Sequence, residues 1–210
     1  MNAEHFFYNI SELVTPFGVG AKHGSAMRQL KQLKNAAVAV SNRKIIWVGL
    51  EKDWQGNANE THDLEGKAVV PGLIDPHTHA VWAGNRLDDF EARTSGMSYE
   101  AILREGGGIR STVRFTQEAS HEQLIQSALP RLTALIQSGA TTIEVKSGYG
   151  FTPEAELKML ETIQHLQPLV PAKLIPTLLI HIPPQAKSER QGYLEQICQQ
   201  LIPEVAKRNL

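Results

Sequence analysis

From residue 68 onward, the sequence alternates short apolar runs with longer amphipathic stretches. The apolar runs cover residues 68–75, 141–145 and 174–180. The first run is continuously apolar, which is typical of a strand buried on both faces of a sheet, and we expect the other two to be buried strands as well. Alternation of such strands with helices predicts an α/β fold with a parallel sheet, of which three strands are too few to close a barrel.

Local signals place helices between and after these runs. Ser120 and Gln123 have the spacing of a capping box, and Gly139 is a suitable C-cap for the helix that Ser120 starts. Pro153 suits the first position of the next helix. We also expect a helix from Ser98 to the glycines at 106–108, and a last one over residues 188–207, interrupted near Pro203.

Residues 1–66 have a different texture, with short apolar runs separated by polar turns. The runs 36–40 and 45–49 flank the polar residues 41–44, which predicts a β-hairpin. We therefore expect two domains: residues 1–66 as a small β-sandwich-like layer, and residues 67–210 as the region of β/α alternation.

Composition excludes some classes of protein. The 210 residues carry a net charge of -1, which gives no electrostatic reason to expect nucleic acid or an acidic membrane as a partner. The single cysteine, Cys198, excludes an internal disulfide and a cysteine-rich zinc site, and its apolar helical setting predicts burial. We find neither a signal peptide nor an apolar run near the roughly 20 residues of a membrane span, and therefore expect a cytoplasmic protein.

Two histidines follow the first apolar run, in the segment Asp75-Pro76-His77-Thr78-His79. Residues i and i+2 of a strand point to the same side, so His77 and His79 could present two imidazoles to one ion. Imidazole suits Zn²⁺ and iron, and β/α barrels gather their active sites at the C-terminal ends of strands. The plainer interpretation is two ordinary loop histidines.

The residues around this pair make the pattern more specific. Residues 71–79 resemble the Pro-Gly-x-Ile-Asp-x-His-x-His signature of the amidohydrolase superfamily. Three further motifs resemble the imidazolonepropionase family in order and approximate spacing: Ala83-Gly84-Asn85-Arg86, Gly106-Gly107-Gly108-Ile109-Arg110-Ser111-Thr112, and Glu144-Val145-Lys146-Ser147-Gly148-Tyr149-Gly150. The resemblance runs through essentially the whole chain and is strongest from Val70 to Leu160.

The resemblance implies a fold, an activity and a cofactor. The fold would be an incomplete amidohydrolase (β/α)8 barrel with the N-terminal part of a small β-sandwich. The activity would be hydrolysis of the cyclic amide of 4-imidazolone-5-propanoate to N-formimidoyl-L-glutamate in histidine breakdown, by a water that one Zn²⁺ or iron ion activates. The protein would act on this small molecule and form a homodimer.

The resemblance also assigns roles to six residues. His77 and His79 match two metal ligands, and Arg86 matches the arginine that receives the substrate propanoate, since its fork suits a carboxylate. Tyr149, His181 and Tyr99 match substrate contacts. From the residues alone, Arg86 could instead form a surface ion pair, and either tyrosine could simply pack.

Two departures from the family pattern matter. The small residues that usually flank the histidine at position 181 are replaced by Leu179-Ile180 and Ile182, which could reorient the ring. Further metal ligands, a histidine and an aspartate, and the catalytic residue are expected beyond Leu210. The 210 residues are therefore expected to be inactive alone, because a catalytic zinc site uses three protein ligands and an open position.

Two alternatives stay open. One is another amidohydrolase, such as a cyclic-amide hydrolase or an aminoheterocycle deaminase, which would share the His-x-His strand but not the other motifs. The other is a non-catalytic fragment that binds a partner. We interpret Lys146 as an ion-pair partner of Glu144 or a later acid, and Gly106–Gly108 as a loop or helix terminator near the substrate entrance.

Overall fold

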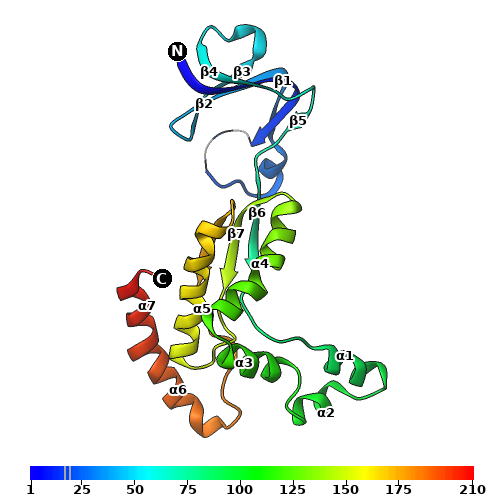
Figure 1. Cartoon of the computed structure of the whole chain (residues 1–210), viewed down its shortest axis with the longest axis vertical. Coiled ribbons are helices and arrows are strands. Elements are labelled where there is room, and N and C mark those ends of the chain that lie inside the picture. Colours follow the sequence, from blue (N-terminus) through cyan, green and yellow to red (C-terminus); the bar gives the residue numbers. More distant parts are fainter. Residues whose placement is uncertain (17, 19) are drawn as a thin grey trace. The chain divides into compact units, whose positions relative to one another are not determined.

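The computed structural model describes residues 1–16, 18 and 20–210. It separates into two compact units, Met1–Pro71 and Gly72–Leu210, whose elements are labelled in Figure 1. In the described part of the chain, no helix combines the length and the apolar character that a membrane crossing needs.

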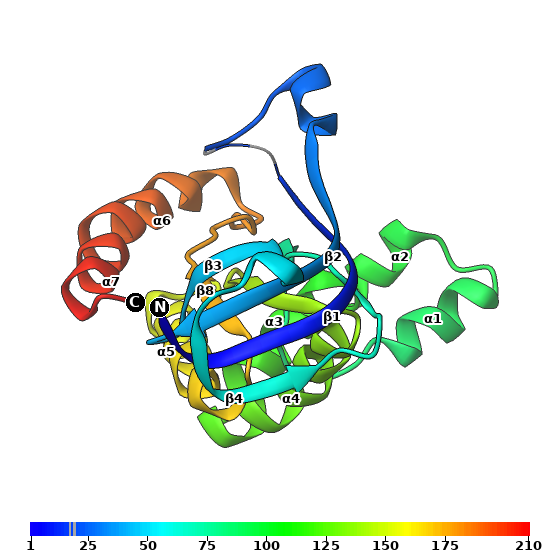
Figure 2. The ribbon, with the colours of Figure 1, turned by 90° about the horizontal axis from the view of Figure 1, so that it is seen from above.

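The first unit is built on one five-stranded sheet. Its strand order is β3-β2-β1-β4, with β5 also paired to β1, and Figure 2 shows the four main strands side by side. Strand β1 is antiparallel to β2 but parallel to β4 and β5. The elements are β1 (Asn2–Pro16), η1 (Gly24–Arg28), β2 (Leu30–Ser41), β3 (Lys44–Leu50), η2 (Glu51–Asp53), β4 (Asn57–Asp63) and β5 (Ala68–Val69).

The predicted hairpin is present, with a shorter turn than expected. Strands β2 and β3 pair antiparallel up to Ser41 and Lys44, so that Asn42 and Arg43 alone form the turn. Their φ angles are 49° and 59°. Two successive positive φ values characterise the type I′ turn, whose twist matches that of the flanking strands. The four-residue turn of the sequence interpretation was therefore wrong in length.

Apolar side chains of this sheet line an open groove of about 480 Å³. Ile10 and Leu13 are buried at its base, whereas Ile45 and Val70 at its edge are 66% and 61% exposed. Such a surface is what the predicted β-sandwich would cover with a second layer. That arrangement of the first unit stays a prediction.

The second unit contains a parallel three-stranded sheet in the order β6-β7-β8. Helices α1 to α4 lie between β6 and β7, with α4 leading directly into β7, and α5 lies between β7 and β8, which confirms the predicted alternation. The strands are β6 (Leu73–Thr78), β7 (Ala140–Lys146) and β8 (Lys173–Thr177). The helices are α1 (Leu87–Thr94), α2 (Tyr99–Arg104), α3 (Ile109–Glu118), α4 (His121–Gln137), α5 (Pro153–Leu166), η3 (Gln167–Leu169), η4 (Lys187–Glu189), α6 (Arg190–Gln196) and α7 (Ile202–Arg208), with a π-helical segment at Ile197–Leu201.

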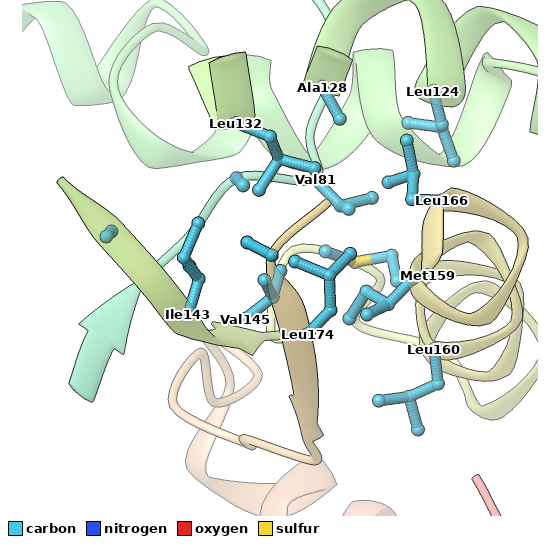
Figure 3. Close-up of a cluster of buried hydrophobic side chains, with 14 of the residues drawn as sticks. Val81, Leu124, Ala128, Leu132, Ile143, Val145, Met159, Leu160, Leu166 and Leu174 are labelled. Atoms are coloured by element: carbon cyan, nitrogen blue, oxygen red, sulfur yellow. The ribbon is translucent and has the colours of Figure 1, made fainter. Parts of the chain in front are cut away.

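The core of this unit lies between the sheet and the two crossover helices, as Figure 3 shows. Leu132 of α4, Ile143 of β7 and Met159 of α5 are each fully buried there. Helix α4 begins with the predicted capping box of Ser120 and Gln123. The predicted start of α4 is therefore confirmed, and it places the helix where its apolar side chains join this core.

Three expectations for this unit were wrong. The run 68–75 is two strands: Ala68–Val69 pairs with β1, and β6 begins at Leu73 after Pro71, which has no N–H to donate. Leu73 and Ile74 are 57% and 67% exposed because β6 is the edge of its sheet. The third strand ends at Thr177 rather than at residue 180, and Cys198 is exposed rather than buried.

The structure contains two helices that were not predicted and one predicted interruption of a helix. Helices α1 and α3 were missed, although Asp88 and Asp89 lie in the first turn of α1, where acids favour a helix start. The last helical stretch is interrupted as expected, since the π-helical segment ends at Leu201, two residues before Pro203. A proline cannot donate the backbone hydrogen bond of a regular helix, and the π-turn accommodates this loss.

Candidate functional site

His77 and His79 lie where β6 reaches the C-terminal end of the sheet. The β6–β7 register shifts between Asp75 and Thr78, and the two imidazole rings stand 6.2 Å apart, edge to face. The Thr78 hydroxyl donates to the Glu144 carbonyl and holds the intervening residue against β7. The histidines thus lie at the end of the strand, as the sequence predicted: His77 is in β6 and exposed, and His79 directly follows it and is half-buried.

Three aromatic rings meet at His79. Its centroid lies 5.1 Å from that of Tyr149 and 5.6 Å from that of His181, and Tyr149 and His181 are also 5.6 Å apart. The three residues come from the segments that directly follow β6, β7 and β8. Parallel strands end at one edge of a sheet, so that segments distant in sequence converge here.

His79 has the properties of a metal ligand. In the described part of the chain, its Nδ1 is buried and finds no hydrogen-bond partner. Burial lowers the pKa of His79 below its ordinary 6.5, and the neighbouring His181 and His77 lower it further. A neutral imidazole with an unpaired ring nitrogen can donate its lone pair to a borderline cation such as Zn²⁺, so the residues fit such an ion.

A charged pair lies beside the histidines. Lys146 forms an ion pair with Glu144, as the sequence interpretation expected, and the Thr177 hydroxyl donates to Glu144 Oε1 over 2.9 Å. Lys146 and then Thr177 hold the pKa of the Glu144 carboxyl below its ordinary value. Glu144 Oε2 is buried without a hydrogen-bond partner among the described residues, so one acceptor is free for a ligand.

The loop that carries Tyr149 is fixed by Glu156, a residue that the sequence interpretation missed. The Glu156 side chain is buried in the first turns of α5, and its carboxylate accepts hydrogen bonds from the backbone N–H groups of Gly148, Gly150 and Phe151 at 2.7–2.9 Å. A buried carboxylate that receives three backbone donors holds the loop in one conformation. The sequence shows Glu156 only as an acid in the first turn of a helix. Such acids are common, and burial of this one is visible only in the structure.

Gly148 lets the His181 ring approach this loop. Its φ is +114°, and a Cβ at this position would lie 2.6 Å from His181 Nδ1. Any larger residue would therefore have to displace the ring as well as adopt a strained backbone. The glycine explains how the loop and the histidine can share one site despite the bulky neighbours of His181.

Arg131 supports the chain just after His79. Its Nη1 donates to the carbonyls of Ala80 and Trp82 over 2.9 and 3.1 Å, and its guanidinium lies 3.5 Å above the Trp82 ring. These contacts fix the segment that leaves β6 against helix α4. The sequence gave no warning of this role, because an arginine in a helix is usually solvent-exposed.

Arg86 and Tyr99 lie elsewhere in the second unit. Arg86 lines a polar cleft of about 230 Å³, and its Nε donates to Thr112 Oγ1 on α3 over 3.0 Å. Tyr99 is exposed, with its hydroxyl 3.6 Å from where a Cβ of Gly108 would be. Both residues flank the start of α3, and the ring contacts that join His79, Tyr149 and His181 do not include them.

Comparison with known proteins identifies relatives for the whole chain. It is 53% identical over 207 residues to an imidazolonepropionase of Deinococcus deserti, and 50% identical over 208 residues to that of Deinococcus radiodurans, each alignment covering 99% of this chain. The imidazolonepropionase of Caldanaerobacter subterraneus is 37% identical over 212 residues. These alignments cover 50–51% of the relatives, so the chain spans about half their length. No protein-family model matches the chain.

The fold has a counterpart among solved structures. Escherichia coli guanine deaminase superposes with a TM-score of 0.53 at 15% sequence identity, over 92% of this chain and 43% of that enzyme. The predicted fold class, an incomplete amidohydrolase barrel, is thereby confirmed. By sequence, the chain is similar along its whole length to imidazolonepropionases, over about half of theirs.

Proposed function

We propose that this chain is the part of a metal-dependent hydrolase that opens the ring of 4-imidazolone-5-propanoate and yields N-formimidoyl-L-glutamate. The observation that carries the proposal is the match of the whole chain to imidazolonepropionases at 50–53% identity. The convergence of His79, Tyr149 and His181 supports it, because these groups could bind and orient a small polar ring.

His77 and His79 would hold the ion, Zn²⁺ or iron, one per site. When bound, such an ion lowers the pKa of a water molecule and polarises a carbonyl oxygen. Two histidines are fewer than the three protein ligands of a catalytic zinc site, so a competent centre needs a further ligand. Turnover by the 210 residues alone is therefore not expected.

The protein's own side chains would position the substrate. The Tyr149 hydroxyl and the His181 imidazole can hydrogen-bond to polar ring atoms, while Glu156 keeps the Tyr149 loop in place. Arg86 would receive the propanoate: Thr112 engages its Nε, and the two terminal nitrogens take no part in that bond. Tyr99 would assist at the same carboxylate.

The test is an activity assay on the native protein, with its intact mass and metal content determined on the same sample. We expect hydrolysis of 4-imidazolone-5-propanoate and about one ion per site only from a protein of about twice this mass, which can supply the further metal ligand, and neither from the 210 residues alone. Arg86→Ala should weaken substrate binding by about 2–5 kcal/mol if the ion pair is desolvated. Arg93→Ala, which removes an exposed arginine at the end of α1, is the matched control and should leave KM unchanged.

Two outcomes would count against the proposal. Hydrolysis of cytosine or a dihydropyrimidine without activity on the imidazolone would favour another amidohydrolase. Metal content unchanged by His77→Ala would remove the strand-end pair as ligands. A homodimer and a cytoplasmic location belong to the same proposal and are testable by sedimentation and cell fractionation.

A further inference from the structure

A second group of metal-binding side chains lies in the first unit, on the β-sheet. His5 of β1 and Glu60 and His62 of β4 bring their ligand atoms together on one face. His5 Nδ1 lies 3.2 Å from His62 Nε2 and 3.3 Å from Glu60 Oε2, and the last two atoms are 3.7 Å apart. In the described part of the chain, this is the one trio whose ligand atoms all lie within 4.8 Å of one another.

The strand register explains why the three side chains meet. Strands β1 and β4 are parallel, with His5 opposite Glu60 and Phe7 opposite His62. Residues that alternate along a strand share a face, so His5 and Phe7 face the same side as Glu60 and His62. The Phe7 ring stacks on His62 with centroids 4.6 Å apart and restrains its orientation. The trio is therefore fixed by backbone pairing rather than by a flexible loop.

The distances fit a tetrahedral ion. Zn²⁺ takes nitrogen and oxygen ligands at about 2.0–2.1 Å, and tetrahedral geometry then separates the ligand atoms by roughly 3.3–3.4 Å. The three observed separations, 3.2, 3.3 and 3.7 Å, bracket that value. Two imidazoles and one carboxylate also form a donor set that zinc accepts, with water in the fourth position.

We propose that His5, Glu60 and His62 form a surface site for Zn²⁺ or a similar borderline divalent cation, independent of the His77 and His79 pair. The ion would be reachable from solvent, since the side chains of His5, Glu60 and His62 are 41%, 63% and 37% exposed. It would link the edge strand β4 to β1, and so stabilise the first unit. A proton shared among the same three groups is the rival explanation of the short distances.

The experiment titrates zinc into the untagged chain in the background His77→Ala/His79→Ala, which removes the other pair. A chromophoric chelator in competition gives stoichiometry and Kd. We expect one Zn²⁺ per chain, and His62→Ala or Glu60→Gln should weaken binding by at least about 100-fold, beyond the 10–100-fold typical of losing a supporting contact. His23→Ala removes an exposed histidine outside the trio and should leave Kd unchanged.

A second readout guards against misfolded variants. In the folded background protein, stoichiometric zinc should shift the imidazole proton resonances of His5 and His62, but not those of His23. If the zinc Kd of His5→Ala and of His62→Ala equalled that of the His23→Ala control, the proposal would be overturned. Unshifted His5 and His62 resonances at saturating zinc would overturn it too, and the trio would then be a proton-sharing cluster.

Discussion

His5, Glu60 and His62 stand on two paired strands, whereas His79, Tyr149 and His181 converge from one strand and two segments that follow other strands. The first group is positioned by the pairing of the two strands, in which side chains alternate between the faces every two residues, and by stacking of Phe7 on His62. The second group depends on side chains that brace the connecting segments, above all Glu156 and Arg131. The group on the paired strands, which we call strand-built, should therefore tolerate substitutions of neighbouring residues. The group on the connecting segments should be sensitive to substitution of the side chains that hold those segments in place.

The largest effect is expected from Glu156→Ala. It would leave the N–H groups of Gly148, Gly150 and Phe151 without their acceptor, and each buried unsatisfied donor costs about 1–3 kcal/mol. We expect the free energy of unfolding of the second unit to fall by about 3 kcal/mol or more, measured by urea denaturation. Glu154→Ala, an exposed acid in the same turn, should cost less than about 1 kcal/mol. Equal losses in both variants would refute the bracing role.

A smaller effect is expected from Gly148→Ala. The positive φ and the clash with the His181 ring should together cost about 1–3 kcal/mol. The control is Gly192→Ala in α6, where a Cβ meets nothing within 4 Å and should stabilise the helix by about 0.5–1 kcal/mol. Thermal unfolding of both variants gives the comparison. If Gly148→Ala were neutral, the loop and ring would not be as closely packed as described.

The strand-built group should withstand a change beside it. Thr61 lies between Glu60 and His62 and faces the opposite side of β4. We expect Thr61→Ala to change stability by less than about 1 kcal/mol, the span of strand propensities, and to leave the nuclear Overhauser contact between the His5 and His62 rings intact. Loss of that contact would show that strand pairing and Phe7 stacking do not suffice to position the trio.

The smallest effect concerns Glu144, and it disappears in acid. The pKa of Glu144 is held below its ordinary 4.5 in the folded state by Lys146 and Thr177. The folded protein therefore binds fewer protons than the unfolded chain just below pH 4.5, and this stabilising contribution is lost as pH falls through the folded-state pKa. Urea midpoints of the wild type and Glu144→Gln should differ most above pH 4.5 and converge below it. Curves that stay parallel would exclude the linkage.

Local sequence signals predicted the second unit well, because capping boxes and apolar runs act over a few residues. Ser120, Gln123 and Pro153 mark helix starts that the structure contains. The run 68–75 misled because its composition does not reveal that Ala68–Val69 pairs with a distant strand. Pairing partners depend on contacts between segments far apart in the chain, which no local pattern encodes.

The site residues also divide into those that local sequence signals reveal and those that depend on contacts between distant segments. In the ring cluster, His79 was predicted from a motif at a strand end, whereas Tyr149 and His181 were named through the resemblance to a family. Glu156 and Arg131 were missed because both bond to backbone groups. Every residue has such groups, so no side-chain pattern in the sequence marks the partners. The His5, Glu60 and His62 trio was missed because its members are 57 residues apart in the chain at their widest, and only the strand register joins them.

The Glu156 carboxylate has a consequence for how the second unit opens and closes. Its two oxygens serve three amides of one loop from the start of one helix, so none of those amides can be exposed singly without giving up the shared acceptor. The loop and the first turn of α5 therefore form one cooperative unit, in which local opening is all-or-none. Solvent access to Tyr149 is thereby tied to fraying of a helix rather than to independent motion of its loop.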